Sequence, residues 1–261
     1  MTHDIDVTPH DRGVLVAGGT LLSWAELAGI CGARAPMSPA AQQRISALLR
    51  IHDHLARLDH PSTRAQQGRT ARDVLLDSAE IMALPRGHVH HLGPAWQHRE
   101  LAGRALSLGL GLRTAEDRPP LPVPHSALQR YDLTAEDCWP QAATRLARHS
   151  AVAAELLTRG GRYAGMLRPV AGSDVLTLLV GGDLRRALAA GDGSGMRAVA
   201  VPGRAQGWYD LTRVDPAYVA LAWQLIDEVD RGVRVPLLVT ADEVVPASIR
   251  GDLIRPVVET R

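Results

Sequence analysis

Residues 114–124, with the sequence TAEDRPPLPVP, constrain the fold of this chain more than any other segment. A proline has no backbone N–H to give to a helix or a central strand, and four of the last six residues here are prolines. We therefore expect either a linker or an extended crossing at this point. It separates a helical region that carries the candidate site (residues 1–113) from a region with a helix and an α+β sheet (residues 125–261).

In the first region, apolar residues recur at helical spacing. The clearest helix start is Ser38-Pro39, because serine caps helices and proline suits their first turn. Gly32 and the pair His60-Pro61 mark breaks between helices. We expect helices over residues 21–30, 39–58, 62–84 and 95–112.

In the second region the period of the apolar residues changes. Thr134 and Asp137 have the spacing of a capping pair and begin a helix that runs to about residue 158. Short apolar runs then predict strands over 162–170, 175–180, 196–201, 207–211 and 233–240, with helices over 183–190 and 216–229, the latter amphipathic. The predicted fold is α+β, with a helical N-terminal half packed on an antiparallel or mixed β-sheet in the C-terminal half.

The composition excludes several classes of enzyme. All 29 positively charged side chains are arginines, because the chain has no lysine, and it also lacks phenylalanine and asparagine. This bias is typical of a high-GC bacterial genome. Without a primary amine, the chain cannot hold pyridoxal phosphate as a Schiff base, and it lacks the lysine of P-loop and kinase sites. The glycines at 181–182 and 191–195 do not have dinucleotide-binding spacing, so we expect no cofactor.

Charge and cysteine content indicate the setting in which the chain works. A formal net charge of +1 is too small to attract a polyanion by electrostatics, so we do not expect nucleic acid as a partner. No apolar run is long enough to cross a bilayer and the N-terminus is polar and acidic, so we expect a cytoplasmic protein that does not bind membranes. Cys31 and Cys138 are expected to be free thiols. The chain could act alone or as a homodimer.

The segment from Arg69 to Arg104 gathers more polar chemistry than any other. Its candidate residues are Arg69, Arg72, His88, His90, His91, Trp96, His98 and Glu100. The His-x-His-His cluster could bind zinc if His98 or Glu100 supplied a further ligand. A polar turn with partly exposed imidazoles is the simpler interpretation, and we expect no metal.

Glu100 has two interpretations. A glutamate followed by an arginine at i+4, here Arg104, is the favourable orientation of a surface ion pair on a helix. Beside Trp96 and an apolar stripe, however, the carboxylate could be partly desolvated, and a desolvated carboxylate can accept a proton near neutral pH.

Three of these residues carry a resemblance to a known family. An arginine on one helix, a histidine in the following turn and a glutamate ten residues later are here Arg72, His90 and Glu100. In a cofactor-independent chain of this size, this arrangement resembles the bacterial Pictet–Spenglerases, the β-carboline synthases of alkaloid pathways. His88 and Arg69 are equal claimants for the histidine and arginine roles. The match covers residues 72–100 alone.

The resemblance implies a reaction and a role for each residue. Tryptophan, or a tryptophan-like amine, would condense with an aldehyde and cyclise to a β-carboline in secondary metabolism. Glu100 would be the general base. His90 or His88 would hydrogen-bond the aldehyde-derived arm. Arg72 or Arg69 would hold the amino acid carboxylate. Candidate walls of the indole pocket are Trp96, Trp208 and Tyr209.

Two other classes stay open. A non-enzymatic interaction or assembly protein would use the helical region as a docking face and leave its histidines exposed. A metal hydrolase would use the histidine cluster as ligands.

Overall fold

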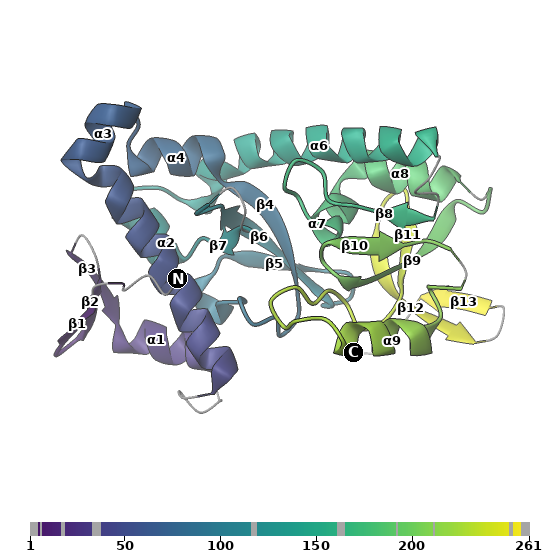
Figure 1. Cartoon of the computed structure of the whole chain (residues 1–261), viewed down its shortest axis with the longest axis horizontal. Helices are drawn as coiled ribbons and strands as arrows, with labels where there is room; N and C mark the ends of the chain where they lie inside the picture. The colour runs from purple at the N-terminus through teal and green to yellow at the C-terminus, as the bar shows by residue number, and fades with distance from the viewer. Residues whose placement is uncertain are drawn as a thin grey trace. The chain divides into compact units, whose positions relative to one another are not determined.

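The computed structural model describes residues 5, 7–16, 19–32, 38–115, 119–160, 165–191, 193–210, 212–250 and 253–256 of the 261-residue chain (Figure 1). Its fold is α+β, and the described strands form three antiparallel sheets. The chain divides into two compact units. The first unit contains residues 1–81, 89–98 and 109–142, and the second contains residues 82–88, 99–108 and 143–261.

The first unit begins with a three-stranded sheet of order β1-β2-β3, which the sequence did not predict. Its strands are Val7–His10, Gly13–Val16 and Thr20–Ser23. The helix expected from residue 21 therefore begins later, and α1 spans Trp24–Cys31. Its cap is the Ser23 hydroxyl, which accepts a hydrogen bond from the Glu26 N–H at 3.1 Å.

The next helices were predicted in part. Helix α2 spans Pro39–Asp59 with Ser38 as its N-cap, which confirms the expected start. The single helix expected over 62–84 is wrong, because α3 (Pro61–Gln67) ends at Gly68 in the left-handed conformation. Thr70 and Asp73 then form a reciprocal capping box that begins α4 (Ala71–Ser78). Strand β4 (Glu80–Pro85) follows it.

The helix expected over residues 95–112 is also wrong. This stretch contains the end of a 3-10 turn, η2 (Gly93–Ala95), strand β5 (His98–Leu101) and strand β6 (Leu106–Leu112). In the sequence LSLGLGL of β6 every second residue is a leucine, which is the period of a strand. All seven β6 residues are buried, and the sheet order is β4-β6-β5.

The proline-rich segment is an extended crossing over residues 119–124. Strand β7 (Leu121–Pro122) pairs with the C-terminal end of β6, with Leu112 opposite Leu121. Val123 continues the pairing by donating its N–H to the Leu110 carbonyl at 3.0 Å. Residues 116–118 of this segment lie outside the described residues. Helices α5 (His125–Arg130) and α6 (Ala135–Arg159) follow, and the expected cap of α6 at Thr134 is present.

The second unit contains an antiparallel sheet in the region where the sequence predicted one, although the strands at 244–250 and 253–256 were not predicted. Its order is β13-β12-β11-β9-β10-β8, and all neighbouring strands pair in the antiparallel direction. The strands are β8 (Met166–Leu167), β9 (Met196–Gly203), β10 (Gln206–Trp208), β11 (Leu237–Thr240), β12 (Val244–Arg250) and β13 (Leu253–Pro256). The expectation of a helical N-terminal half is not supported, since strands β1 to β7 also lie there.

One predicted strand of this region is a helix. Residues Val175–Val180 form α7, because the Asp174 carboxylate caps the segment by accepting the Thr177 N–H at 2.8 Å. Helix α8 (Gly182–Ala190) matches its prediction, and α9 (Pro216–Gln224) ends five residues earlier than expected. Residues 162–164 of another predicted strand lie outside the described residues. No helix among the described residues is long and apolar enough to span a membrane.

Candidate functional site

Glu100, the predicted general base, lies at the surface of the second unit. It belongs to β5, and its carboxylate pairs with the Arg104 guanidinium at 3.1 Å, with 48% of the Glu100 side chain exposed. Glu100 precedes a turn in which Ala102, Gly103 and Arg104 all have positive φ. Glu100 lines a hollow of about 490 Å³ that also contains Arg185 and Asp242. The Glu100 carboxylate is therefore half-exposed and paired, beside a hollow whose wall mixes charged and aliphatic residues.

The two predicted arginines lie in the first unit and are both exposed. Arg69 pairs with the Asp77 carboxylate at 3.2 Å. Arg72 is in the first turn of α4. Hydrogen bonds from Thr70 lower the pKa of Asp73, and the charges of Arg69 and Arg72 add to this effect. Both arginines therefore lie beside carboxylates of the protein itself.

The predicted histidines are more buried than a solvated turn would allow. His88, in the second unit, donates from Nε2 to the Val229 carbonyl at 3.2 Å. His90, in the first unit, is 5% exposed. The alternative with partly exposed imidazoles therefore does not describe His88 or His90.

Trp96 is the centre of a three-ring cluster in the first unit. Its indole is 1% exposed and donates Nε1–H to the Leu110 carbonyl at 2.8 Å. His98 stacks on it with ring centroids 5.2 Å apart, and His91 meets both rings edge-on. Burial lowers the pKa of His91 to about 4, and the neighbouring His98 and Arg44 add to this shift. Trp96 is a packed core residue.

The two remaining aromatic candidates lie in the second unit. Trp208 meets Tyr218 edge-on at 5.9 Å and packs against a cluster that contains Val219. Tyr209 is half-buried, and the Arg197 guanidinium lies 5.0 Å from its ring centroid. Tyr209 was predicted as a wall of an aromatic pocket, and it does line a cavity.

This cavity has a volume of about 420 Å³ and belongs wholly to the second unit. Most of its wall is aliphatic and comes from the end of α6, from β8 with the loop after it, and from α7. The lining residues are Ala153, Leu156, Leu157, Arg159, Gly160, Met166, Leu167, Arg168, Pro169, Val170, Val175, Leu178, Leu184 and Tyr209. Such a wall carries no polar motif, so sequence reasoning had no signal by which to find it.

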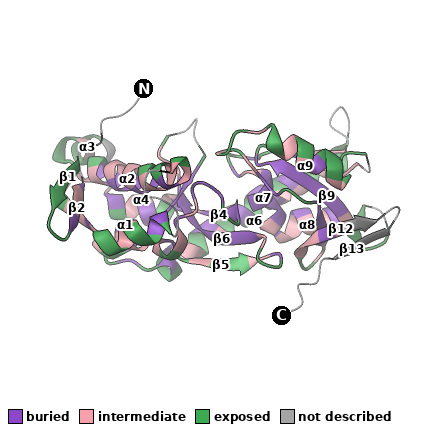
Figure 2. Ribbon diagram, turned by 90° about the horizontal axis from the view of Figure 1, so that it is seen from below, coloured by how far each residue is buried: buried purple, intermediate pink, exposed green. Residues whose placement is uncertain are grey.

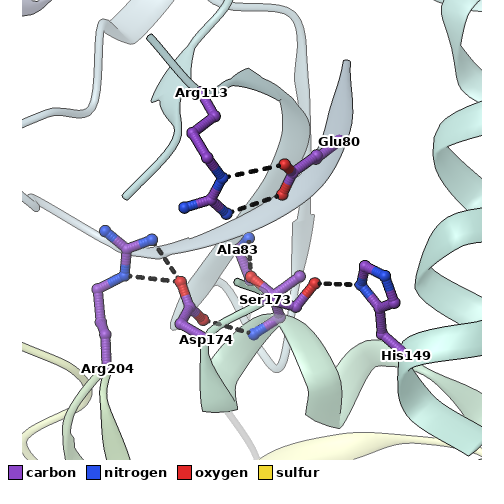
Figure 3. Close-up of polar contacts among 8 residues, drawn as sticks. Glu80, Ala83, Arg113, His149, Ser173, Asp174 and Arg204 are labelled. Carbon is purple, nitrogen blue, oxygen red and sulfur yellow. Dashed lines mark hydrogen bonds and ion pairs between the residues drawn. The ribbon is translucent and has the colours of Figure 1, made fainter. Parts of the chain in front are cut away.

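A network of buried polar contacts holds the turn that follows the cavity wall (Figure 3). Asp174 caps α7 and pairs with Arg204, whose Nε lies 3.0 Å from the carboxylate. Ser173 Oγ lies 2.9 Å from His149 Nδ1 on α6, and both side chains are buried. The Thr177 hydroxyl of α7 accepts the Ala83 N–H at 3.0 Å. These contacts fix the segment between two cavity-lining residues, Val170 and Val175.

A second polar chain ties three helices of the first unit together. The Ser126 hydroxyl donates to the Glu26 carboxylate at 2.7 Å, so His52 Nε2, 3.0 Å from the same oxygen, is the donor to Ser126. His52 is fully buried. Burial, followed by the charge of Arg130, lowers its pKa to about 4.

The described residues contain no group of three or more histidine, cysteine, aspartate or glutamate side chains that could hold a metal ion. No protein-family model, no curated protein and no solved structure matches the chain. The function must therefore be argued from the geometry of the site itself.

Proposed function

We propose that the second unit binds a small molecule with an apolar body and an anionic group in the cavity at the end of α6. The single observation that carries this proposal is the lining: an aliphatic wall with one tyrosine and two arginines. A volume of about 420 Å³ falls within the range of roughly 300–1,000 Å³ that is usual for ligand pockets.

The apolar part of the ligand would contact the aliphatic wall. Leu178 and Val175 are almost fully buried and contribute a rigid surface, whereas Leu156 is 53% exposed and its apolar surface would be covered by a ligand. Removing such surface from water contributes about 25 cal/mol per Å². Tyr209 offers an aromatic face, which favours an aromatic ligand over a purely aliphatic one.

The anionic group would be held by the two arginines. Arg159 and Arg168 both line the cavity and are exposed, so their guanidinium groups lie on its solvent side. Arg159 pairs with Glu155 at 3.1 Å, but an ion pair this exposed contributes at most about 1 kcal/mol. A ligand carboxylate could therefore recruit this guanidinium at small cost, in the bidentate geometry that arginine favours.

Tryptophan belongs to this ligand class, since it joins an aromatic body to a carboxylate. No described lining residue carries a carboxylate or an imidazole, so the cavity offers ligand-binding groups but no general base. We therefore propose binding as the function. The Pictet–Spengler condensation with an aldehyde stays a prediction, to be tested by incubating the protein with tryptophan and aldehydes and searching for β-carbolines by mass spectrometry.

Titration calorimetry with three indole compounds tests the binding proposal. We expect indole-3-propionate and tryptophan to bind more tightly than tryptamine, which has no carboxylate. Arg159→Ala and Arg168→Ala should each weaken the binding of the two carboxylates by about 5- to 50-fold and change tryptamine binding little. The matched control is Arg186→Ala, since Arg186 is equally exposed but does not line the cavity.

A variant that reduces the cavity tests the apolar wall. Ala153→Leu places a larger side chain in the wall and should abolish the binding of all three compounds. If none of them binds the unmodified protein, or if Arg186→Ala acts like the two lining arginines, the proposal is wrong.

We also propose a cytoplasmic location for this binding protein. Both cysteines are free and buried, which is usual where thiols stay reduced. Cell fractionation followed by immunoblotting should recover the protein with a cytoplasmic marker enzyme, and recovery in another fraction would contradict this location.

A further inference from the structure

A serine and a histidine of the second unit form a buried pair beside the cavity. Ser173 Oγ lies 2.9 Å from His149 Nδ1, which is the separation of a hydroxyl nucleophile and its base. Ser173 is 5% exposed and His149 is 8% exposed. Neither residue is among those that line the cavity, and the binding of a ligand there requires neither.

The pair joins two parts of the cavity wall. Residues four positions apart share a face of a helix, so His149 lies one turn of α6 before Ala153, which lines the cavity. Ser173 lies in the short segment between Val170 and Val175, which both line it. The hydroxyl and the imidazole therefore lie directly next to the space in which a ligand would bind.

The turn that carries Ser173 is strained and closely held. Ala171 has a φ of 47°, a left-handed conformation that is uncommon for residues other than glycine, and Gly172 has a φ of 85°. Two hydrogen bonds close the turn: the Val170 N–H donates to the Ser173 carbonyl at 3.1 Å, and the Ser173 N–H donates to the Val170 carbonyl at 2.9 Å. Helix α7 follows after Asp174, and five of its six residues are buried (Figure 2). Backbone strain of this kind is concentrated at active sites.

The two side chains have complementary chemistry. A serine hydroxyl is a weak nucleophile until a neighbouring base takes its proton, and an imidazole is the side chain that most often does so. In the tautomer that carries its proton on Nε2, His149 Nδ1 accepts the hydrogen bond of the Ser173 hydroxyl. The base is then already in contact with the proton that it would remove.

We propose that Ser173 is a catalytic nucleophile, that His149 is its general base, and that the pair hydrolyses an ester held in the cavity. His149 Nδ1 takes the hydroxyl proton as Ser173 Oγ bonds to the ester carbonyl carbon. The bond from this carbon to the alkoxy oxygen then breaks, and the alcohol leaves with the proton from His149. Water, deprotonated by the same imidazole, attacks the acyl group on Ser173 and releases it as a carboxylic acid. The net reaction converts an ester and water to an acid and an alcohol.

The substrate class rests on the proposed ligand-binding function, which determines what the cavity holds. The aliphatic wall suits an ester with an apolar acyl group, and Arg159 suits an anionic group. Arg159 follows His149 by ten residues of α6, which is about 15 Å along the helix axis at about 1.5 Å per residue. We therefore expect an elongated ester that carries a carboxylate at the end remote from the reacting carbonyl.

Labelling with an alkyl fluorophosphonate tests the nucleophile. The serine oxygen forms a bond to phosphorus, the bond from phosphorus to fluorine breaks, and fluoride leaves. Peptide mass spectrometry of the unmodified protein should locate the adduct on Ser173, and this result requires no variant to fold. Ser173→Ala should not be labelled. The matched control is Ser194→Ala, which removes an exposed serine outside the cavity and should be labelled normally.

Two further variants separate a catalytic role from a structural one. The glutamine of His149→Gln can still hydrogen-bond the Ser173 hydroxyl but cannot take its proton. Labelling of this variant should therefore slow by about 100-fold or more, with little change in the melting temperature measured by circular dichroism. Ala153→Leu should also prevent labelling, because it fills the space beside the pair. No adduct, an adduct on another residue, or labelling of His149→Gln at the unmodified rate would each overturn the proposal.

Turnover is measured with 4-nitrophenyl esters, whose alcohol is coloured when it is released. We expect the butyrate ester to be hydrolysed faster than the acetate ester, and Ser173→Ala to be inactive. An unmodified protein that hydrolyses neither ester would contradict the proposed reaction. The ligand-binding proposal can fail separately: if Ser173 is labelled but no indole compound binds, the nucleophile stands and that proposal is wrong. If the indole carboxylates bind but Ser173 is not labelled, the reverse holds.

Discussion

The indole of Trp96 occupies the space that a side chain at Gly109 would need. A Cβ atom built on Gly109 would lie 2.5 Å from Trp96 Cε2 and 2.6 Å from the Gln97 carbonyl oxygen. The same indole donates its N–H to the carbonyl of Leu110, the next residue of β6. Strand β6 therefore carries a glycine because the buried tryptophan lies flat against its backbone.

We expect Gly109→Ala to destabilise the protein. Neither the backbone of Gln97 nor the buried indole can withdraw easily, so the added methyl should cost about 1–3 kcal/mol and occasionally more, as overpacking does. The midpoint of urea unfolding, followed by tryptophan fluorescence, measures this loss.

Gly29→Ala is the matched control for this prediction. Gly29 lies within α1, and no atom lies within 4 Å of a Cβ built on it. Replacing an unhindered glycine in a helix by alanine stabilises by roughly 0.5–1 kcal/mol. If both variants lost the same stability, the Trp96 contact would not be the cause.

The stability of the first unit should fall in mild acid. His52 and His91 each have a pKa lowered to about 4, mainly by burial. Between pH 6.5 and 4 the unfolded chain binds protons on both rings and the folded chain does not, so stability is full above this window and falls as the pH drops through it. Each ring can contribute roughly 3 kcal/mol to this loss. Melting temperatures at about pH 7.5, 6, 5 and 4 measure the slope.

His52→Gln separates titration from hydrogen bonding. The glutamine amide can still donate to the Ser126 hydroxyl but cannot bind a proton in this range. We expect this variant to melt with a shallower pH dependence than the unmodified protein. An unchanged slope would mean that other groups cause the acid sensitivity.

The sequence predicted elements best where a local cap decides the structure. Three helices begin at a residue whose side chain hydrogen-bonds the first turn: Ser38 before α2, Thr134 before α6 and Asp215 before α9. A few adjacent residues therefore determine where each of these helices begins. The α+β class followed from these helices and from the short apolar runs after residue 162.

Short apolar runs were assigned to the wrong element at residues 80–84, 106–112 and 175–180. Residues 175–180 are nearly all buried and have no polar face from which to read a period, whereas residues 106–112 alternate leucine with a small residue, a strand period that the sequence analysis missed. In β6 the glycine at 109 leaves room for Trp96, and the helix at residues 175–180 is capped by Asp174, which Arg204 holds.

The candidate site was harder to predict than the fold. From the sequence we predicted a site among the polar residues between 69 and 104. In the structure these residues belong to two different units. The cavity has aliphatic walls contributed by residues 153–184 and Tyr209. Tyr209 was the one lining residue that an aromatic-pocket argument could find.

We expect Glu100→Gln to leave both stability and ligand binding in the cavity nearly unchanged. Glu100 forms an exposed ion pair with Arg104 and lines a different hollow, so its loss should cost less than about 1 kcal/mol. Urea unfolding and calorimetry with tryptophan measure the two quantities. If condensation with an aldehyde is detected, a fall in turnover of about two to four orders of magnitude in this variant would assign Glu100 the role of base.

Asp174→Asn should be the most damaging single change in the second unit among those considered. The asparagine can still cap α7, but Arg204, which is 3% exposed, would lose its counter-charge. Breaking a buried ion pair in this way costs about 3–5 kcal/mol of unfolding free energy. The exposed control Asp183→Asn, which removes the partner of Arg186, should cost under about 1 kcal/mol.

The double variant Asp174→Asn with Arg204→Met removes the buried charge altogether and should recover part of the loss. Urea unfolding of the four proteins measures this series, and a double variant less stable than Asp174→Asn would show that packing by Arg204, and not its unpaired charge, sets the cost.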